Sequence, residues 1–229
     1  MLLAIAGISL RELTRRRAAL LLVIALPLAF YAARSDEPGQ AVRFLALGVG
    51  WAVATLALFS HVGSRHLDRR LAVVGASPTA LLLGRQLALL GTGFTIAGAY
   101  LVLVAVAQDV ERLWAVALLL GTTVLVAAPL GAVVSLALPR ELEGALALLA
   151  VMATQMLADP EGTLAKVLPL WSTRELTTYA VDATGEEFLH RGLLHFAAAF
   201  ALCACGAWAA AVVRLRPSTP PEPVPATAA

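Results

Sequence analysis

The longest uncharged run of the chain contains the stretch "LWAVALLLGTTVLVAAPLGAVVSLAL", which extends from Leu113 to Leu138. A helix needs roughly 20 apolar residues to cross the hydrocarbon core of a bilayer, so this run is long enough to cross at a tilt. Its apolar residues do not alternate with polar ones, as they would in a strand of a membrane β-barrel. The run therefore predicts a transmembrane helix.

Similar runs occupy most of the chain on both sides of this one. Of the 229 residues, 60% are apolar and 14% are charged, whereas a soluble domain is usually about half apolar and a quarter charged. The charges gather in short segments between long apolar runs. We predict a single all-α polytopic membrane domain over residues 1–215. Its six transmembrane helices cover residues 18–33, 44–62, 87–107, 113–138, 144–158 and 192–213.

The first apolar run, "AALLLVIALPLAF", follows three arginines and so resembles the core of a secretory signal peptide. An apolar stretch already precedes the arginines, however, and no small-x-small cleavage pattern follows before Arg34. We therefore expect an uncleaved first span.

The two ends of the chain differ from the apolar runs. In "MLLAIAGISLRELTRRR", a helix would place Leu2, Ile5, Ser9 and Leu13 on one face, which indicates an amphipathic helix lying on the membrane surface. Residues 216–229 are rich in proline, and we expect them to form a disordered tail.

The basic residues predict the orientation. Cytoplasmic segments of membrane proteins carry an excess of Lys and Arg. If the N-terminus is cytoplasmic, 11 of the 17 basic residues lie in cytoplasmic segments and six lie outside. We therefore expect a multi-pass protein of the plasma (inner) membrane, with both termini in the cytoplasm.

The predicted spans contain no acidic or basic residue in their middle, and all five aspartates fall in loops. Ion-coupled carriers usually keep a buried ionisable group or an unwound polar site at mid-membrane. An intramembrane aspartyl protease would likewise need two buried aspartates. The absence of such groups argues against both classes.

Familiar catalytic motifs are also absent. The histidines do not form the His-Glu-x-x-His motif of zinc proteases, and no Gly-x-x-x-x-Gly-Lys-Ser/Thr phosphate loop occurs. "GISL" lacks the second glycine of a nucleophile elbow. We expect no enzymatic activity, no bound cofactor or metal, and no nucleic-acid partner, so any energy for transport must come from another chain.

The segment "SRHLDRRLAVVGASPTALLLGRQ", residues 64–86, lies between the second and third predicted spans. With the six spans and the N-terminal amphipathic helix, this basic loop resembles the ABC-2-type permease family, the membrane subunits of type-2 ABC exporters. In that family the corresponding loop forms a coupling helix that inserts into a cleft of the ATPase. The resemblance assigns ATPase docking to seven residues: Arg65, His66, Asp68, Arg69, Arg70, Leu71 and Pro78.

The loop matches the family motif only in part. Ser77-Pro78 and Gly84 stand where the family has Ser/Thr-Pro and a later glycine, and Arg85 replaces the lysine that follows. The acidic residues and the Gly-Thr of the usual motif are missing. The helix should still form, with Pro78 marking a turn or the start of the next helix.

A second part of the resemblance follows the fifth span, where residues 159–188 would lie outside the membrane. In the family, short extracellular helices in this position re-enter the outer leaflet and cap the translocation path. The resemblance assigns this gate to Pro169, Trp171, Glu175 and Tyr179. Ser172 and Glu175 have the spacing of a helix capping box, and an ordinary exposed loop with interfacial aromatic anchors is the alternative.

The family resemblance implies an ATP-driven transport subunit, with ATP and Mg²⁺ bound by a separate cytosolic ABC ATPase. It also implies a second permease subunit, identical or related. An apolar lining would favour export of a hydrophobic or amphipathic cargo, such as a lipid, a drug or a natural product. A haem-handling member of the family is a further alternative, although haem would need axial His or Met ligands. The competing class is a channel or assembly scaffold without an ATPase.

Overall fold

The computed structural model describes residues 1–15, 17–138, 140–159, 162–182 and 184–215, and every regular element within them is an α-helix. The helices are α1 (Leu2–Arg15), α2 (Arg17–Ala32), α3 (Pro38–Gly63), α4 (Arg65–Val73), α5 (Pro78–Ala107), α6 (Leu113–Ala137), α7 (Glu141–Leu157), α8 (Thr163–Val167), α9 (Ser172–Val181) and α10 (Glu186–Arg214). The predicted all-α class is confirmed. The proline-rich tail, predicted to be disordered, lies outside the described residues.

Four helices of the described chain are long and apolar enough to cross a membrane, namely α3, α5, α6 and α10. The other two predicted spans correspond to α2, with 16 residues, and α7, with 17. At 1.5 Å per residue these helices extend about 24 and 26 Å, less than the roughly 30 Å of a typical hydrocarbon core. A crossing by these two helices therefore stays a prediction.

The predicted boundaries agree closely for α2 and α6, and the predicted starts are wrong for α3, α5 and α10, the last of which begins at Glu186 and not at 192. Helix α3 begins at Pro38, six residues before the predicted 44, and α5 begins at Pro78, nine residues before the predicted 87. Both extensions contain an arginine, Arg43 or Arg85. The helices continue past these charges because each guanidinium leaves the apolar interior near the helix end: Arg85 binds Asp68 of α4, and Arg43 lines a polar cavity.

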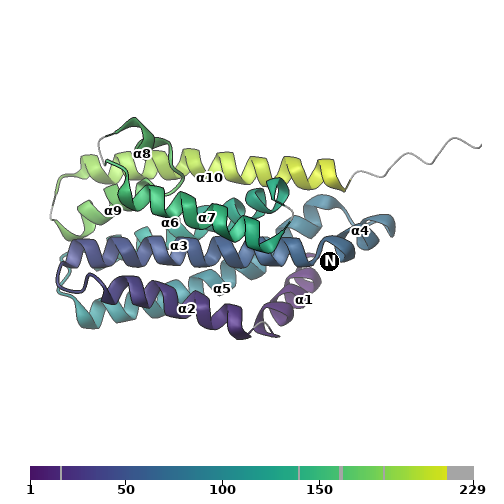
Figure 1. The fold of residues 1–229 in the computed structure, drawn as a ribbon, viewed down its shortest axis with the longest axis horizontal. Helices are drawn as coiled ribbons and strands as arrows, with labels where there is room; N and C mark the ends of the chain where they lie inside the picture. Colours follow the sequence, from purple (N-terminus) through teal and green to yellow (C-terminus); the bar gives the residue numbers. More distant parts are fainter. Residues whose placement is uncertain (16, 139, 160–161, 183, 216–229) are drawn as a thin grey trace, which may run out of the picture.

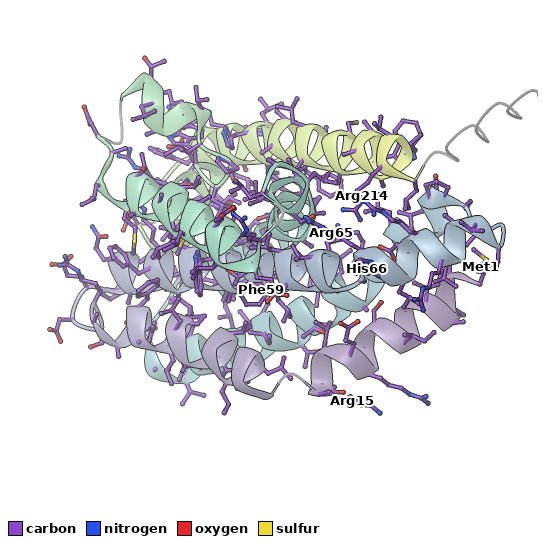
Figure 2. The ribbon with its side chains drawn as sticks, turned by 45° about the vertical axis from the view of Figure 1, so that its right-hand side comes forward. Met1, Arg15, Phe59, Arg65, His66 and Arg214 are labelled. Atoms are coloured by element: carbon purple, nitrogen blue, oxygen red, sulfur yellow. The ribbon has the colours of Figure 1, made fainter. Side chains whose placement is uncertain are left out.

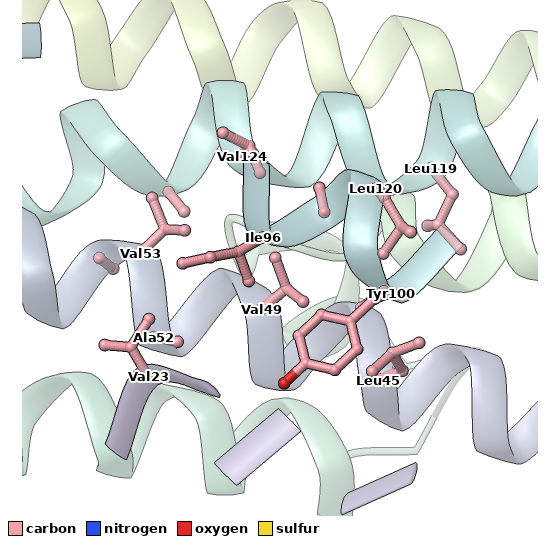
Figure 3. Close-up of a cluster of buried hydrophobic side chains, with 14 of the residues drawn as sticks. Val23, Leu45, Val49, Ala52, Val53, Ile96, Tyr100, Leu119, Leu120 and Val124 are labelled. Atoms are coloured by element: carbon pink, nitrogen blue, oxygen red, sulfur yellow. The ribbon is translucent and has the colours of Figure 1, made fainter. Parts of the chain in front are cut away.

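Helices α3 and α6 form the centre of the bundle. In its most apolar window α3 is 78% buried, against 17% for α10, so α3 is an interior helix and α10 a peripheral one. Figure 3 shows Val49 and Val53 of α3 packing with Ile96 of α5 and Val124 of α6. A Cβ atom at Gly131 of α6 would overlap the backbone of α3, so this close contact needs glycine.

The bundle has two distinct ends (Figure 1). Helix α4 and the start of α1 lie at one end, and α8 and α9 lie at the other. Helix α1 runs obliquely to the bundle and packs on α5. Ile5, Ser9 and Leu13 are buried, so they share one face as the sequence predicts, although this face packs against protein. Leu2, predicted on the same face, is 39% exposed. That α1 rests on a membrane surface stays a prediction.

Candidate functional site

Helix α4 forms a short connection between two long helices. It begins directly after Ser64, where α3 ends, and the chain turns back at Gly75, whose φ of +94° is a conformation that favours glycine. Helix α5 then starts at Pro78, and the hydroxyl of Ser77 accepts a hydrogen bond of 3.2 Å from the amide of Ala80. This N-cap and the proline in the first turn are typical of helix starts, and they confirm that Pro78 marks the start of the next helix.

One side of α4 is open to its surroundings. The exposed side chains include three apolar ones, Leu67 at 43%, Val73 at 87% and Val74 at 80%. His66, Arg69 and Arg70 are exposed beside them. We call these six residues the α4 surface: His66, Leu67, Arg69, Arg70, Val73 and Val74. Large exposed apolar side chains among basic ones are typical of a surface that contacts another molecule.

The opposite side of α4 carries a buried ion pair. Asp68 is 4% exposed, and so is Arg85 of α5. The Nη2 atom of Arg85 donates to Oδ1 of Asp68 at 2.9 Å, and its Nη1 atom donates to Oδ2 at 3.2 Å. Ser64 donates to the same carboxylate at 3.4 Å, and Arg214 of α10 lies 3.9 Å from it. Bidentate pairing of this kind is both strong and directional.

Further hydrogen bonds join this ion pair to the rest of the bundle. Arg85 also donates to the carbonyl of Ser60 in α3, at 3.3 Å. Arg65 of α4 donates to the carbonyl of Ser135 in α6. Burial, and next the nearby Arg69, lower the pKa of Arg65 below its ordinary value. The polar contacts of Asp68, Arg85 and Arg65, which we call the α4 joint, therefore tie α4 to four long helices, α3, α5, α6 and α10.

The seven residues predicted to dock an ATPase are thus divided between two sides of the segment. His66, Arg69 and Arg70 belong to the α4 surface, whereas Arg65 and Asp68 belong to the α4 joint. Leu71 is half-buried and packs on a small apolar cluster of Ile5, Leu81 and Leu215, and Pro78 lies at the base of α5. Figure 2 shows Arg65, His66 and Arg214 at the same end of the molecule. Leu67, Val73 and Val74 were not predicted, although each is an apolar side chain in an otherwise charged loop, which is the one sequence feature that sets them apart.

The segment that contains α8 and α9 folds back into the opposite end of the bundle. Leu170, in the turn before α9, is buried against the middle of α3 and α6. A Cβ atom at Gly50 of α3 would lie 2.7 Å from a methyl group of Leu170 and 3.0 Å from the methyl group of Thr123 of α6. Because Gly50 and Thr123 lie near the midpoints of two long apolar helices, this turn reaches deep between them.

Helix α9 is almost wholly enclosed by α3, α6 and α10. Two of its buried hydroxyls are hydrogen-bonded within the protein: Thr173 donates to the carbonyl of Leu170 at 2.7 Å, and Thr177 to that of Thr173 at 2.6 Å. Glu175 lies 3.0 Å from Arg191 of α10. Within the described chain the two hydroxyls are therefore hydrogen-bonded, whereas Glu175 has an ion pair without an aligned hydrogen bond.

The four predicted gate residues all lie in or beside this folded-back segment. Pro169 is half-buried in the turn before α9, and the ring of Trp171 lies beside that of His195, with centres 5.2 Å apart and planes tilted by 60°. The ring of Tyr179 lies under the guanidinium of Arg112 at 4.3 Å and meets the edge of Trp114 at 5.8 Å. Tyr179 is 7% exposed, so it is a packed residue of the bundle.

The predicted capping box is wrong. Helix α9 begins at Ser172 with Trp171 in the N-cap position, and no side chain caps it. Glu175 instead faces Arg191, and Arg112 donates to the carbonyls of Tyr179 and Thr184, at 2.8 and 3.0 Å, near the end of the helix. The helix is therefore held by neighbouring helices and by Arg112 at its C-terminal end.

Within the described residues, no cluster of three or more His, Cys, Asp or Glu side chains is placed to hold a metal ion. Neither protein-family models nor curated proteins give a match to this sequence.

Proposed function

We propose that this chain is the membrane subunit of an ATP-driven ABC transporter, which exports a hydrophobic or amphipathic compound. A separate cytosolic ATPase supplies the energy by docking on residues 64–80. The observation that carries the proposal is the two-sided construction of α4, which has an exposed surface for a partner and a buried polar joint to four long helices.

Force transmission requires a surface that binds the ATPase and a firm attachment of that surface to the long helices. The two sides of α4 provide one each. The α4 surface combines three exposed apolar side chains with Arg69 and Arg70, so a partner gains both burial of apolar area and charge complementarity. The α4 joint holds Asp68 bidentately on Arg85. A push on α4 therefore acts directly on the start of α5 and the end of α3, with little freedom for α4 to move alone.

The segment that contains α8 and α9 supports a gate in the same scheme. It fills the space between α3, α6 and α10 at the end opposite α4. A movement of these helices relative to one another would change the space around Leu170. In the proposed orientation this end faces the exterior, where a gate controls release of the cargo.

The peripheral helices support a partner within the membrane. The most apolar windows of α5 and α10 are only 28% and 17% buried, and large side chains such as Phe94 and Trp208 are exposed on them. Lipid covers part of this surface, and we propose that a second permease subunit covers the rest. An apolar groove of about 670 Å³ between α1, α2 and α5 is large enough for alkyl chains of an amphipathic cargo.

Site-specific crosslinking tests the docking proposal. A photoreactive residue is placed at Val73 on the α4 surface and, as the control, at the exposed Val106 at the other end of α5. Crosslinking in membranes of the source cell should trap a chain with a nucleotide-binding motif at Val73 and not at Val106. The complex purified in mild detergent should hydrolyse ATP.

A pair of variants makes the same test quantitative. Replacing Val73 and Arg69 together by Asp should lower retention of the ATPase about tenfold, since burial of one Val and one favourable charge contribute about 1–3 kcal/mol. The fold should be unaffected because both side chains are exposed. An unchanged ATPase content in this variant, or a crosslink to no nucleotide-binding chain, would indicate a channel or scaffold without a motor.

A further inference from the structure

A polar cavity of about 520 Å³ lies at the end of the bundle opposite α4. It is formed by the turn after α2, the first two turns of α3, and α9. This volume is within the roughly 300–1,000 Å³ typical of small-molecule sites. Its charged lining residues are Arg43, Arg174, Asp36, Glu37 and Asp182.

Two arginines from different helices face this cavity without an acidic partner. Arg43 lies on α3 and Arg174 on α9, close enough for their positive charges to repel each other. Within the described residues neither guanidinium takes part in an ion pair. The Nε of Arg43 is buried and lacks a hydrogen-bond partner there. Two unpaired guanidiniums at one cavity favour an anionic group between them.

The acidic residues are gathered at a different part of the same cavity. Asp36 and Glu37 belong to the turn that leads into α3, and Asp182 follows the last residue of α9. An oxygen of the Asp182 carboxylate lies 3.7 Å from the point that a Cβ atom on Gly39 would occupy, in the first turn of α3. Arg43 lies one turn further along α3, and Arg174 lies two turns before Asp182 on α9. The cavity therefore has an acidic side at the helix ends and a basic side deeper in the bundle.

We propose that this cavity binds a zwitterionic head group, one that joins a phosphate or carboxylate to an ammonium group. The anionic group lies between Arg43 and Arg174, and the ammonium group lies toward Asp36, Glu37 and Asp182. A purely anionic ligand would meet three carboxylates at the rim, so the cavity favours a ligand that carries both charges. Both a membrane phospholipid and a soluble amino-phosphate have this chemistry.

Binding to the purified full-length chain tests the proposal without any ATPase, so its outcome is independent of the transport function. The delipidated protein in mild detergent is titrated with phosphatidylethanolamine, phosphatidylglycerol, glycerophosphoethanolamine and inorganic phosphate. Native mass spectrometry measures the bound fraction. Phosphatidylethanolamine should bind at least fivefold more tightly than phosphatidylglycerol, which has the phosphate and lacks the ammonium group. Inorganic phosphate should bind more weakly than either lipid.

Three variants assign the two charges. Arg174→Gln should weaken phosphatidylethanolamine binding about tenfold, as expected for loss of a charge-assisted hydrogen bond, and Arg174→Lys should restore part of it. Asp182→Asn should reduce the preference for phosphatidylethanolamine over phosphatidylglycerol to about twofold. Arg34→Gln is the matched control, because Arg34 is an exposed arginine of the same turn that stacks over Phe44 and does not line the cavity.

The titration also separates the two sources of the head group. Binding of glycerophosphoethanolamine as tight as that of the lipid supports a soluble ligand, and binding that needs the acyl chains supports a phospholipid. Equal affinity for phosphatidylethanolamine and phosphatidylglycerol would overturn the zwitterionic assignment. An Arg174→Gln variant that keeps the wild-type elution profile and binds as the wild type does would overturn the site.

Discussion

Helices α4 and α9 are both short, carry acidic and basic residues, and connect long apolar helices, yet they differ in how far the bundle buries them. Val73 at the end of α4 is 87% exposed, whereas Leu176 in the middle of α9 is 1% exposed. Each helix has one acidic side chain turned inward, Asp68 or Glu175, which faces an arginine of a long helix. The comparison shows that α4 is attached to the bundle along one side, while α9 is part of its interior.

The arginine partners of these two carboxylates differ as well. Arg85 is as buried as Asp68 and binds it through two hydrogen bonds. Arg191 is 55% exposed along its side chain, and its contact with Glu175 is a single approach of 3.0 Å. Both carboxylates are therefore buried, but the Arg191 charge reaches solvent and the Arg85 charge does not, so removal of the two carboxylates should have very different costs.

The largest effect is expected for the variant Asp68→Ala. Removing one partner of a buried pair leaves the Arg85 charge uncompensated, which typically costs about 3–5 kcal/mol. Chemical unfolding of the purified chain in detergent measures this loss of stability. The variant should also release α4, so that proteolysis within residues 64–77 becomes faster.

The exposed pair of Arg140 and Glu143 provides the matched control for this experiment. Its N–O distance is 2.6 Å, but the Arg140 side chain is 79% exposed. Glu143 raises the pKa of Arg140 through this hydrogen bond, yet Arg140→Ala should change the stability only slightly, because an exposed ion pair contributes little. Equal stabilities of the Asp68→Ala and Arg140→Ala variants would show that the α4 joint does not hold α4.

A smaller but substantial effect is expected for Leu170→Ala, which tests the depth of the segment that contains α8 and α9. Leu170 is 5% exposed and fills the space beside Gly50, so the truncation should leave a cavity and cost about 2–4 kcal/mol. The same substitution at Leu164 of α8, which is 61% exposed, should have little effect. The thermal unfolding midpoints of the two variants are compared. Similar midpoints would mean that Leu170 is exposed like Leu164 and does not reach between α3 and α6.

The sequence predicted the apolar helices best where charges bound them on both sides. The predicted 18–33 and 113–138 differ by one residue from α2 and α6. The predictions for α3 and α5 were too short because they excluded Arg43 and Arg85. Whether a charge near a helix end continues the helix depends on a partner distant in the sequence, and Asp68 lies 17 residues from Arg85.

That the two candidate segments are functional sites stays a prediction, and the orientation of their side chains was not predictable from the sequence. A nine-residue helix with charges on several faces gives no indication of which side turns inward, so Asp68 and Arg70 received the same predicted role. The capping box failed for a related reason. Glu175 has the required spacing from Ser172, but Arg191 of α10 lies beside it, and only the tertiary structure brings α10 to α9.

The smallest effect is expected for Glu175→Gln, which completes the comparison of the two carboxylates. The contact with Arg191 is an ion pair without an aligned hydrogen bond within the described chain. Arg191 stays half-exposed in the variant and still stacks on Phe188 at 4.7 Å, so its charge keeps some contact with solvent. The cost should be at most about 1 kcal/mol.

Salt separates this contribution from one made by packing. The interaction between a carboxylate and a half-exposed guanidinium is screened, since the Debye length falls from about 10 Å at 0.1 M salt to about 3 Å at 1 M. The difference in unfolding midpoint between the wild type and Glu175→Gln should therefore shrink as salt is raised, whereas that of Asp68→Ala should persist. A Glu175→Gln variant as unstable as Asp68→Ala at every salt concentration would mean that both ends of the bundle depend on buried charge to the same degree.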